Sequence, residues 1–359
     1  MEEKQELKEK PEEQKESHKK RNIGEMYDKY YKIALIIPVI LLVLSLIYLY
    51  NFSQQNGDII KKDISLTGGT SIQVNAKADI NELKFTLNKN FNGVSISSIS
   101  DILTGEQVAV MIETRAQPEE IVPEIEKYFG FTLNSENSSI EFTGSTIGEG
   151  FYKQLMLAVF FAFLFMGTVV FFIFSNNKKI KYLLIVLSLI PPILFFFTKS
   201  ITLTQAFIIS GIILLISIYF YIRYSIPSLA VVFAAFADIV MTVTTVDLLG
   251  MEVSTAGIVA FLMLIGYSVD TDILLTTRVL KHKGESVNKR ILSSFKTGIT
   301  MTLTALAVVV IGLILTSSFS DVLKQIFTIL TIGLLFDILN TWLTNASMVK
   351  WYVAYKKLD

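Results

Sequence analysis

The stretch from Ser254 to Leu280, STAGIVAFLMLIGYSVDTDILLTTRVL, is long and apolar enough to cross a membrane, yet it contains two carboxylates. A bilayer core is about 30 Å thick, so a spanning helix needs roughly 20 apolar residues. An ionisable side chain inside such a helix costs about 2.5–3.5 kcal/mol on insertion scales and points to a functional position. Asp270 and Asp272 are two residues apart, which is about 200° around a helix, so they do not share a face. This stretch therefore predicts a membrane helix with a polar site.

Apolar and charged residues are segregated along the whole chain. Of the 359 residues, 52% are hydrophobic and 18% are charged, and the charges gather in a few blocks. This pattern argues against a disordered chain and against a soluble enzyme. Cysteine is absent, and the two histidines, His18 and His282, lie far apart in polar segments, which argues against a zinc site. We expect a non-enzymatic membrane protein without a metal or a cofactor.

Eight apolar runs are long enough to span the membrane. They are 33–50, 154–174, 180–198, 204–222, 226–248, 253–276, 297–316 and 324–349. Lys and Arg gather in the short loops after the second, fourth, sixth and eighth runs, and such loops stay on the cytoplasmic side. We therefore expect a multi-pass protein of the cell membrane with both termini in the cytoplasm.

The polar segments between these runs predict the domain organisation. Residues 1–32 carry nine basic and nine acidic side chains and are expected to form a disordered cytoplasmic tail. The first membrane helix, 33–50, is expected to be an uncleaved anchor, because the block before it is too long and too acidic for a signal peptide. Residues 51–152 are expected to form an external domain, 153–350 a helical membrane domain, and 351–359 a cytoplasmic tail.

The external segment 51–152 has the pattern of an α+β domain. Its seven basic and fourteen acidic side chains argue against nucleic acid as a partner. Strand-like and helical runs follow one another in the order β-α-β-β-α-β, which predicts a ferredoxin-like fold. The strand-like runs are 71–76, 94–99, 107–113 and 139–143, and the helical runs are 79–91 and 118–129. A glycosylation sequon begins at Asn137, and whether it is used stays open.

Four carboxylates lie inside the apolar runs: Asp238, Asp270, Asp272 and Asp337. Asp238 and Asp270 lie at similar depth on antiparallel neighbouring runs, so we expect them to approach each other. Carboxylates that meet in apolar surroundings can share and pass on a proton. We favour this proton-relay interpretation for Asp238, Asp270 and Asp272. For Asp337 we favour the alternative, a hydrogen-bonded side chain that fixes helix packing.

Three motifs together resemble one known family. They are Thr67-Gly68-Gly69-Thr70, the segment RYSIPSLAVVFAAFADIV at 223–240, and the stretch 254–280 with its Gly266, Tyr267 and Ser268. The chain resembles the SecF branch of the SecD/SecF family of protein-export membrane proteins, of the archaeal type, within the resistance–nodulation–division superfamily. The resemblance covers roughly residues 33–170 and 223–350, and its third motif is the most specific.

The resemblance implies a partner and a role. Members pair with SecD and assist an unfolded polypeptide through the Sec translocation channel, surrounded by membrane lipid, and in bacteria the proton gradient drives this step. It also implies that membrane carboxylates conduct the proton while the external domain changes orientation. The family's Asn-Asp pair matches Asp270 and Thr271, so Asp270 and Asp272 are expected to replace the relay residue. Lys296 matches a basic residue that opens the next span and is a further candidate for the proton relay, and Ser65 stands where the family often has Asp.

The predicted span count differs from that of the family. Members usually have six spans, so the hairpin 177–222 is expected to be an insertion of unknown role. Two other functions stay open. One is a proton-driven exporter of lipids or small molecules, which would need a second half from a partner. The other is a passive membrane chaperone without proton flux.

Overall fold

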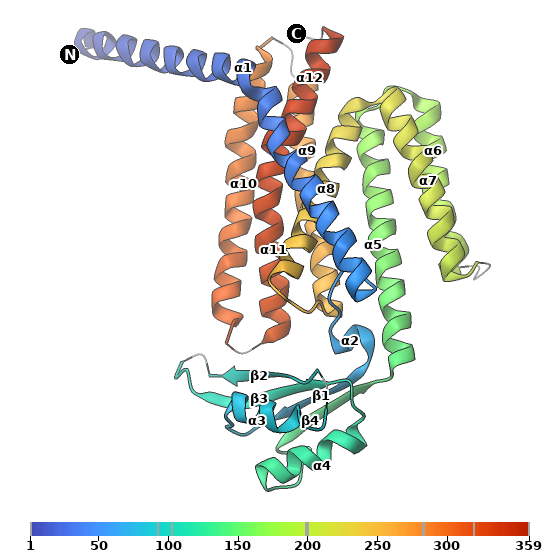
Figure 1. The fold of residues 1–359 in the computed structure, drawn as a ribbon. Helices are drawn as coiled ribbons and strands as arrows, with labels where there is room; N and C mark the ends of the chain where they lie inside the picture. The colour runs from blue at the N-terminus through green and yellow to red at the C-terminus, as the bar shows by residue number, and fades with distance from the viewer. Residues whose placement is uncertain are drawn as a thin grey trace.

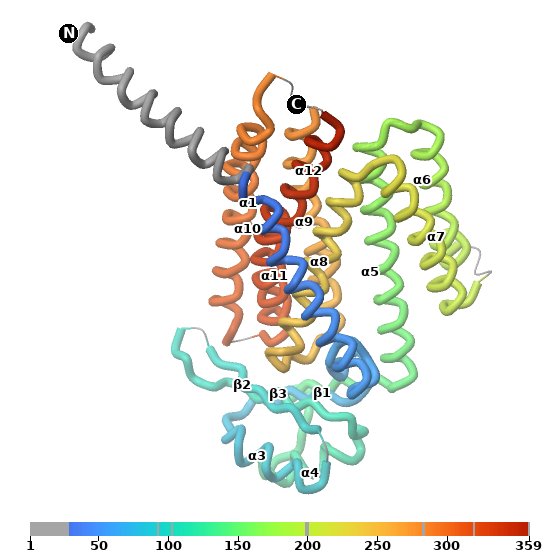
Figure 2. Tube along the Cα trace, turned by 45° about the horizontal axis from the view of Figure 1, so that its top comes forward, coloured from blue at the N-terminus to red at the C-terminus, as the bar shows by residue number. Residues whose placement is uncertain are grey.

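The computed structural model describes residues 29–357, apart from 92, 102, 198–200, 282–283 and 319. The predicted tail 1–32 therefore lies outside the described residues except for its last four. The described chain is a bundle of long helices with a small sheet domain at one end (Figure 1). The first described residues of α1 and the end of α12 both lie at the opposite end of the bundle (Figure 2).

Among the described residues, eight helical segments are long and apolar enough to cross a membrane, as the sequence predicts. Their elements are α1 (Glu2–Asn56, described from Lys29), α5 (Ser145–Phe174), α6 (Lys178–Pro192) with the π-helix η1 (Ile193–Phe197), α7 (Leu203–Tyr224), α8 (Ile226–Leu248), α9 (Thr255–Lys281), α10 (Val287–Thr316), and α11 (Asp321–Leu339) with the π-helix η2 (Asn340–Asn345) and α12 (Ala346–Lys356). The eighth span is thus one helical path with a π-helical turn in its middle.

Helices α8 and α9 form the centre of the bundle. They bury more of their surface than any other described span. Small residues allow this close packing. Gly333 of α11, for example, lies directly against Leu264 of α9, where even a methyl group would overlap the leucine side chain. The centre of the bundle is consequently tight, and a polar group there is cut off from water.

Helices α6 and α7 form a hairpin at the edge of the molecule. They pack on each other and on α5, and α7 also contacts α8 (Figure 1). Pro191 and Pro192 end the regular part of α6, and the π-helix η1 follows them. Large apolar side chains on the outer surface of the hairpin, such as Leu215 and Tyr219, are exposed, as expected for a surface that faces lipid.

The sheet domain confirms the predicted ferredoxin-like fold. Its strands are antiparallel in the order β2-β3-β1-β4. The elements are α2 (Ile64–Thr67), β1 (Gly69–Val74), α3 (Ile80–Leu87), β2 (Ser95–Ser100), β3 (Gln107–Thr114), α4 (Pro118–Phe129) and β4 (Ser138–Thr143). The helices α3 and α4 cover one face of the sheet over a core that includes Ile72, Ile112 and Ile125. The other face of the sheet is turned toward the membrane helices (Figure 1).

Two chain segments connect the sheet domain to the bundle, and they cross each other at glycines. Gly68 ends α2 with a φ of 82°, which favours glycine, and its backbone lies against Ser145 at the start of α5. A Cβ added to Gly148 would lie 2.7 Å from the nitrogen of Gly68. Side chains would separate the two segments, so the glycines allow them to form a single joint.

Candidate functional site

Three carboxylates from three helices meet in the middle of the bundle. Asp238 of α8 and Asp272 of α9 are 0% exposed, and Asp337 of α11 is 1% exposed. Burying an ionised carboxylate in apolar surroundings is costly unless hydrogen bonds or opposite charges compensate. In the described part of the chain, no ion pair joins any of the three to a lysine or an arginine. Hydroxyl and amide groups surround them instead.

Asp238 links helices α8 and α9 to the π-helix η2. The Ser268 hydroxyl donates a hydrogen bond to Asp238 Oδ2 at 2.5 Å, and the Asn340 amide donates one to Oδ1 at 2.7 Å. Asn340 Oδ1 in turn accepts a hydrogen bond from Thr344 at 3.2 Å. Both oxygens of this carboxylate are therefore satisfied by neutral donors.

Asp272 and Asp337 share a single threonine. Thr341 Oγ1 lies 2.9 Å from Asp272 Oδ1 and 3.1 Å from Asp337 Oδ1. Asn345 donates a further hydrogen bond to Asp272 Oδ1 at 2.8 Å, whereas Asp272 Oδ2 is buried without a hydrogen-bond partner in the structure. Thr302 of α10 reaches Asp337 Oδ2 at 3.4 Å. The three carboxylates and their partners thus connect four of the helical spans.

The π-helical turn of η2 supplies most of these partners. Residues five apart in a π-helix face the same side, so Asn340 and Asn345 both point inward, toward Asp238 and Asp272 respectively. In a regular α-helix, residues five apart would point in different directions. Isolated π-helical turns inside α-helices are frequent at functional sites. Sequence reasoning treated 324–349 as one apolar run and missed these residues, although two Asn-Thr pairs, 340–341 and 344–345 in opposite order, interrupt it.

The structure places the predicted site residues in different surroundings. Asp238 and Asp272 lie in the cluster, but Asp270 is exposed on the outer side of α9 and Lys296 is exposed on α10. The expected approach of Asp238 and Asp270 is therefore not seen, because the inner side of α9 carries Ser268 and Asp272 at these positions. Asp337, for which we favoured a packing role, is a full member of the cluster.

The other motif residues have separate surroundings. Gly266 and Tyr267 are exposed on α9, two residues and one residue before the buried Ser268. Gly68 and Gly69 lie at the joint between the sheet domain and the bundle, and the Thr70 hydroxyl donates a hydrogen bond to the carbonyl of Ala116 at 2.6 Å. The first motif is therefore part of the connection between the two domains rather than part of the carboxylate cluster.

The arrangement is suited to moving protons and gives no support for a metal site. Within the described ranges, no group of three or more His, Cys, Asp or Glu side chains is placed to hold a metal ion. Carboxyl, hydroxyl and amide groups form two hydrogen-bonded groups, one around Asp238 and one around Asp272 and Asp337. Among these groups only the carboxyls gain and lose protons readily. The cluster therefore has the chemistry of a proton-binding site closed off from water.

A family model and individual relatives point to the same protein family. A family model described as "Protein export membrane protein SecD/SecF, C-terminal" matches residues 196–355, which include α7 and so begin inside the predicted insertion 177–222. A protein-export membrane protein SecF from Methanocaldococcus jannaschii is 34% identical over 332 residues, covering 90% of this chain and 96% of that protein. The protein of the same name from Methanothermobacter thermautotrophicus is 32% identical over 332 residues, covering 90% and 93%.

A similar fold occurs in a solved structure. The crystal structure of SecDF, a translocon-associated membrane protein from Thermus thermophilus, has a TM-score of 0.57 and 18% sequence identity to this chain. The match covers 92% of this chain but 38% of that longer protein. At this identity the likeness concerns the fold alone.

Proposed function

Because this chain belongs to the SecF branch of the SecD/SecF family of protein-export membrane proteins, we propose that it is a non-enzymatic subunit of protein translocation. It pairs with SecD, lies beside the Sec channel and assists unfolded polypeptides in crossing the cell membrane. The proton gradient drives this step, and Asp238, Asp272 and Asp337 carry the proton within the membrane.

One observation supports the proton relay above all others, namely the position of Thr341 between Asp272 and Asp337. Its hydroxyl has one proton and can donate to only one carboxylate at a time. The second contact is favourable only when that carboxyl group is itself protonated and donates to the threonine oxygen. The pair is therefore suited to holding one shared proton, which can change sides without a helix moving.

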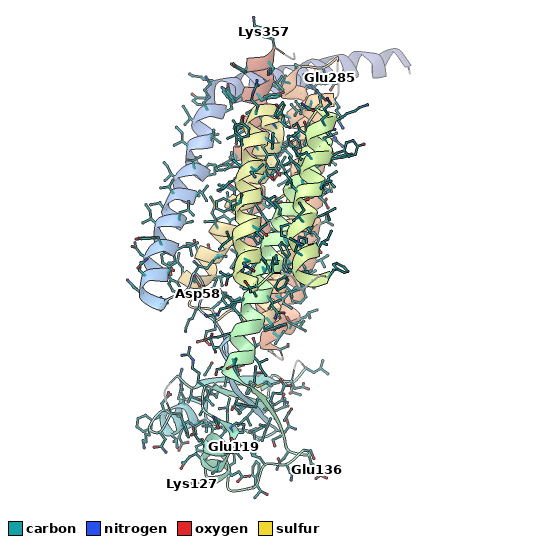
Figure 3. All side chains as sticks on the ribbon, turned by 90° about the vertical axis from the view of Figure 1, so that its right-hand side faces the viewer. Asp58, Glu119, Lys127, Glu136, Glu285 and Lys357 are labelled. Carbon is teal, nitrogen blue, oxygen red and sulfur yellow. The ribbon has the colours of Figure 1, made fainter. Side chains whose placement is uncertain are left out.

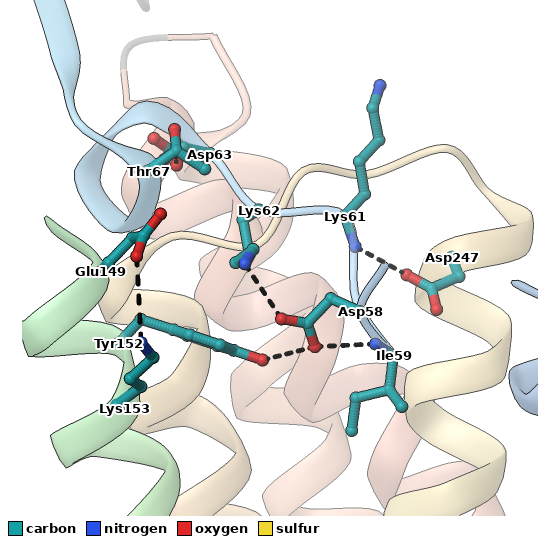
Figure 4. Close-up of polar contacts among 10 residues, drawn as sticks. All are labelled: Asp58, Ile59, Lys61, Lys62, Asp63, Thr67, Glu149, Tyr152, Lys153 and Asp247. Atoms are coloured by element: carbon teal, nitrogen blue, oxygen red, sulfur yellow. Dashed lines mark hydrogen bonds and ion pairs between the residues drawn. The ribbon is translucent and has the colours of Figure 1, made fainter. Parts of the chain in front are cut away.

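The loop between α8 and α9 offers a route from this cluster to the sheet domain. The Val253 nitrogen donates to the Lys61 carbonyl at 2.7 Å, and the Asp63 nitrogen donates to the Val253 carbonyl at 3.1 Å. Near the end of α8, Asp247 Oδ1 accepts a hydrogen bond from the Lys61 backbone nitrogen at 3.3 Å (Figure 4). A change in protonation that shifts α8 against α9 would consequently pull on the segment that enters the sheet domain.

The orientation follows from charge. The end of the bundle opposite the sheet domain carries the basic residues of the loops and of α12, among them Arg278, Lys281 and Lys356. Basic loops stay in the cytoplasm, so this end faces the cytoplasm and the acidic domain at 51–152 faces outward. Figure 3 shows the two ends of the molecule, with Glu285 and Lys357 at one end and Glu119, Lys127 and Glu136 at the other.

The relay is tested by neutralising Asp272 and, as a matched control, Asp270. Both Asp272→Asn and Asp270→Asn remove one carboxylate from α9, but only the first removes a buried one. We expect Asp272→Asn to abolish proton-dependent stimulation of export in vesicles that contain the chain, SecD and the Sec channel, and Asp270→Asn to leave it unchanged. If export and its dependence on the proton gradient survive Asp272→Asn, the chain acts as a passive chaperone and the relay is wrong.

A separate experiment tests the partnership. When the full chain is purified from its native membrane under mild conditions, we expect SecD to accompany it. Repeated purification without SecD or any Sec-channel subunit would favour the alternative of a small-molecule or lipid exporter, whose second half would then be found instead. The two experiments fail independently, because the first concerns energy coupling and the second concerns assembly.

A further inference from the structure

The sheet domain is attached at one edge and rests on the bundle at the other. The glycine joint lies where β1 begins and β4 ends, and these two strands are neighbours in the sheet. The strand β2 is at the opposite edge, beneath the external ends of α10 and α11 (Figure 1). There the Ser100 nitrogen donates to the Ser318 carbonyl at 2.8 Å, and the Ser97 hydroxyl donates to Asp321 Oδ2 at 2.5 Å.

Two connected cavities separate the sheet from the bundle between these edges. Their volumes are about 460 and 650 Å³, and they share the side chains of Asp63, Glu113 and Asp321. Acidic groups predominate in both. The charged side chains that face these cavities are the carboxylates of Asp63 before α2, Glu113 on β3, Glu141 on β4, Glu252 in the α8–α9 loop and Asp321 on α11, and the ammonium groups of Lys61 before α2 and Lys84 on α3.

Glu113 occupies the centre of this acidic gap. It is half-buried, on the strand between β2 and β1, with carboxylates of the bundle opposite. One of the two lysines is already engaged, since Lys61 Nζ lies 2.9 Å from Glu252. When Glu113 is ionised, the docked sheet therefore places like charges across a partly dehydrated gap. Like charges repel more strongly there than in bulk water.

We propose that Glu113 is a pH-sensitive latch, which in its protonated form lets the sheet domain rest on the bundle and in its ionised form drives the β2 edge away about the glycine joint. The latch responds to the pH of the solution around the sheet domain, because both cavities lie between this domain and the adjoining ends of the membrane helices. It is separate from the buried carboxylate cluster and does not depend on the role in protein export.

The acid–base behaviour of Glu113 supports the direction of the latch. Burial raises its pKa from 4.5 to about 7, and the negative charges of Asp63, Asp321 and Glu252 act in the same direction. The docked form thus binds a proton more readily than a form in which Glu113 is solvated. Docking is consequently favoured below about pH 4.5, is weakened as the pH rises toward 7, and changes no further above that. Over this interval the docked-to-released ratio falls by at most about 300-fold.

Spin labels on the full chain in lipid nanodiscs test the latch. The chain contains no cysteine, so Asn90→Cys beside α3 and Ser317→Cys at the end of α10 give one label on each side of the gap. Labels attached at a fixed pH keep thiol chemistry out of the measurement. Pulsed electron–electron double resonance then measures the distance that separates the two labels, at several pH values from 5 to 8.

We expect one short distance at pH 5 and a growing population of longer distances toward pH 8. Glu113→Gln should keep the short distance throughout, and Asp321→Asn should leave a smaller population of longer distances at pH 8, because one repelling charge is lost. Glu136→Gln, at the far end of the domain, should behave as the unaltered chain. Identical distances at pH 5 and pH 8 in the unaltered chain, or an undiminished transition in Glu113→Gln, would overturn the proposal.

Discussion

Asp270 and Asp272 are separated by a single residue in α9 and lie in opposite surroundings: Asp272 is fully buried among hydrogen-bonding partners, and Asp270 is exposed on the outside of the helix. Asp270 is therefore a matched control for Asp272, because the two carboxylates lie on the same helix at almost the same depth in the bundle.

Replacing Thr341 should interrupt the connection between Asp272 and Asp337. Thr341→Val keeps the shape of the side chain but removes the hydroxyl that both carboxylates contact. We expect a loss of about 1–3 kcal/mol in stability, because a buried acceptor loses its partner, together with slower proton uptake. Thermal unfolding and proton-release measurements in nanodiscs check the two effects. The control is Thr331→Val, whose hydroxyl bonds only to its own helix; equal effects of the two variants would contradict a shared proton.

The glycine joint predicts a position-specific effect of a single methyl group. Gly148→Ala would place a Cβ 2.7 Å from the Gly68 nitrogen, whereas Gly150→Ala, two residues on in the same helix, meets nothing within 4 Å. We expect Gly148→Ala to cost roughly 1–3 kcal/mol through overpacking and to expose the connecting segments to protease. Gly150→Ala should be neutral or slightly stabilising, because alanine favours helix. Limited proteolysis and thermal unfolding distinguish the two variants. If both variants gave the same results, a tight contact at Gly148 would be contradicted.

Tyr152 should anchor α5 to the end of the first span. Its hydroxyl donates a 2.7 Å hydrogen bond to Asp58, and Asp58 also pairs with Lys62 at 3.0 Å (Figure 4). Tyr152→Phe retains the ring under the Lys62 ammonium group and removes only the hydrogen bond. A loss of about 1–2 kcal/mol is expected, since one partner is charged. Tyr182→Phe, at a 63% exposed position, serves as the comparison and should change the unfolding temperature very little.

The latch also predicts a pH-dependent difference in thermal stability. Because the folded-state pKa of Glu113 is raised to about 7, its ionisation opposes the docked structure as the pH rises from about 4.5 to 7. Glu113→Gln should therefore raise the unfolding temperature relative to the unaltered chain by a few degrees, roughly 2–5 °C, at pH 8 and by much less at pH 5. A difference between the two chains that is constant across this range would show that the substitution acts through packing instead.

The spans and the sheet domain could be predicted from the sequence because each has a simple local signal. Apolar runs of about 20 residues predict spans directly, and Asp79 and Gly130 mark the start of α3 and the end of α4, where the structure places a capping side chain and a left-handed glycine. These signals depend on neighbours in the chain and not on the packing of distant helices.

Only part of the site could be predicted from the sequence, because the site depends on how distant helices pack. That Asp270 and Asp272 face different sides follows from helix geometry, but which one faces inward depends on the rotation of α9 against α8 and α11. The contribution of Asn340, Thr341 and Asn345 depends on a π-helical turn, whose wider spacing no α-helical periodicity contains. The surroundings of Asp337 could not be read from the sequence, because Thr302 and Asp272 reach it from other helical spans.

The π-helical turn of η2 also sets the rotation of the last helix. A π-helical turn holds about one residue more than an α-helical turn, so it takes up one residue without turning the helix that follows. If the same residues formed a regular α-helix, everything after the turn would rotate by about 100° relative to α11, which would carry Asn345 away from Asp272 and move Trp351 to another side of the molecule. The extra residue in η2 therefore keeps the inner side of α12 aligned with the inner side of α11, and a change that regularises this turn would misplace the whole last helix.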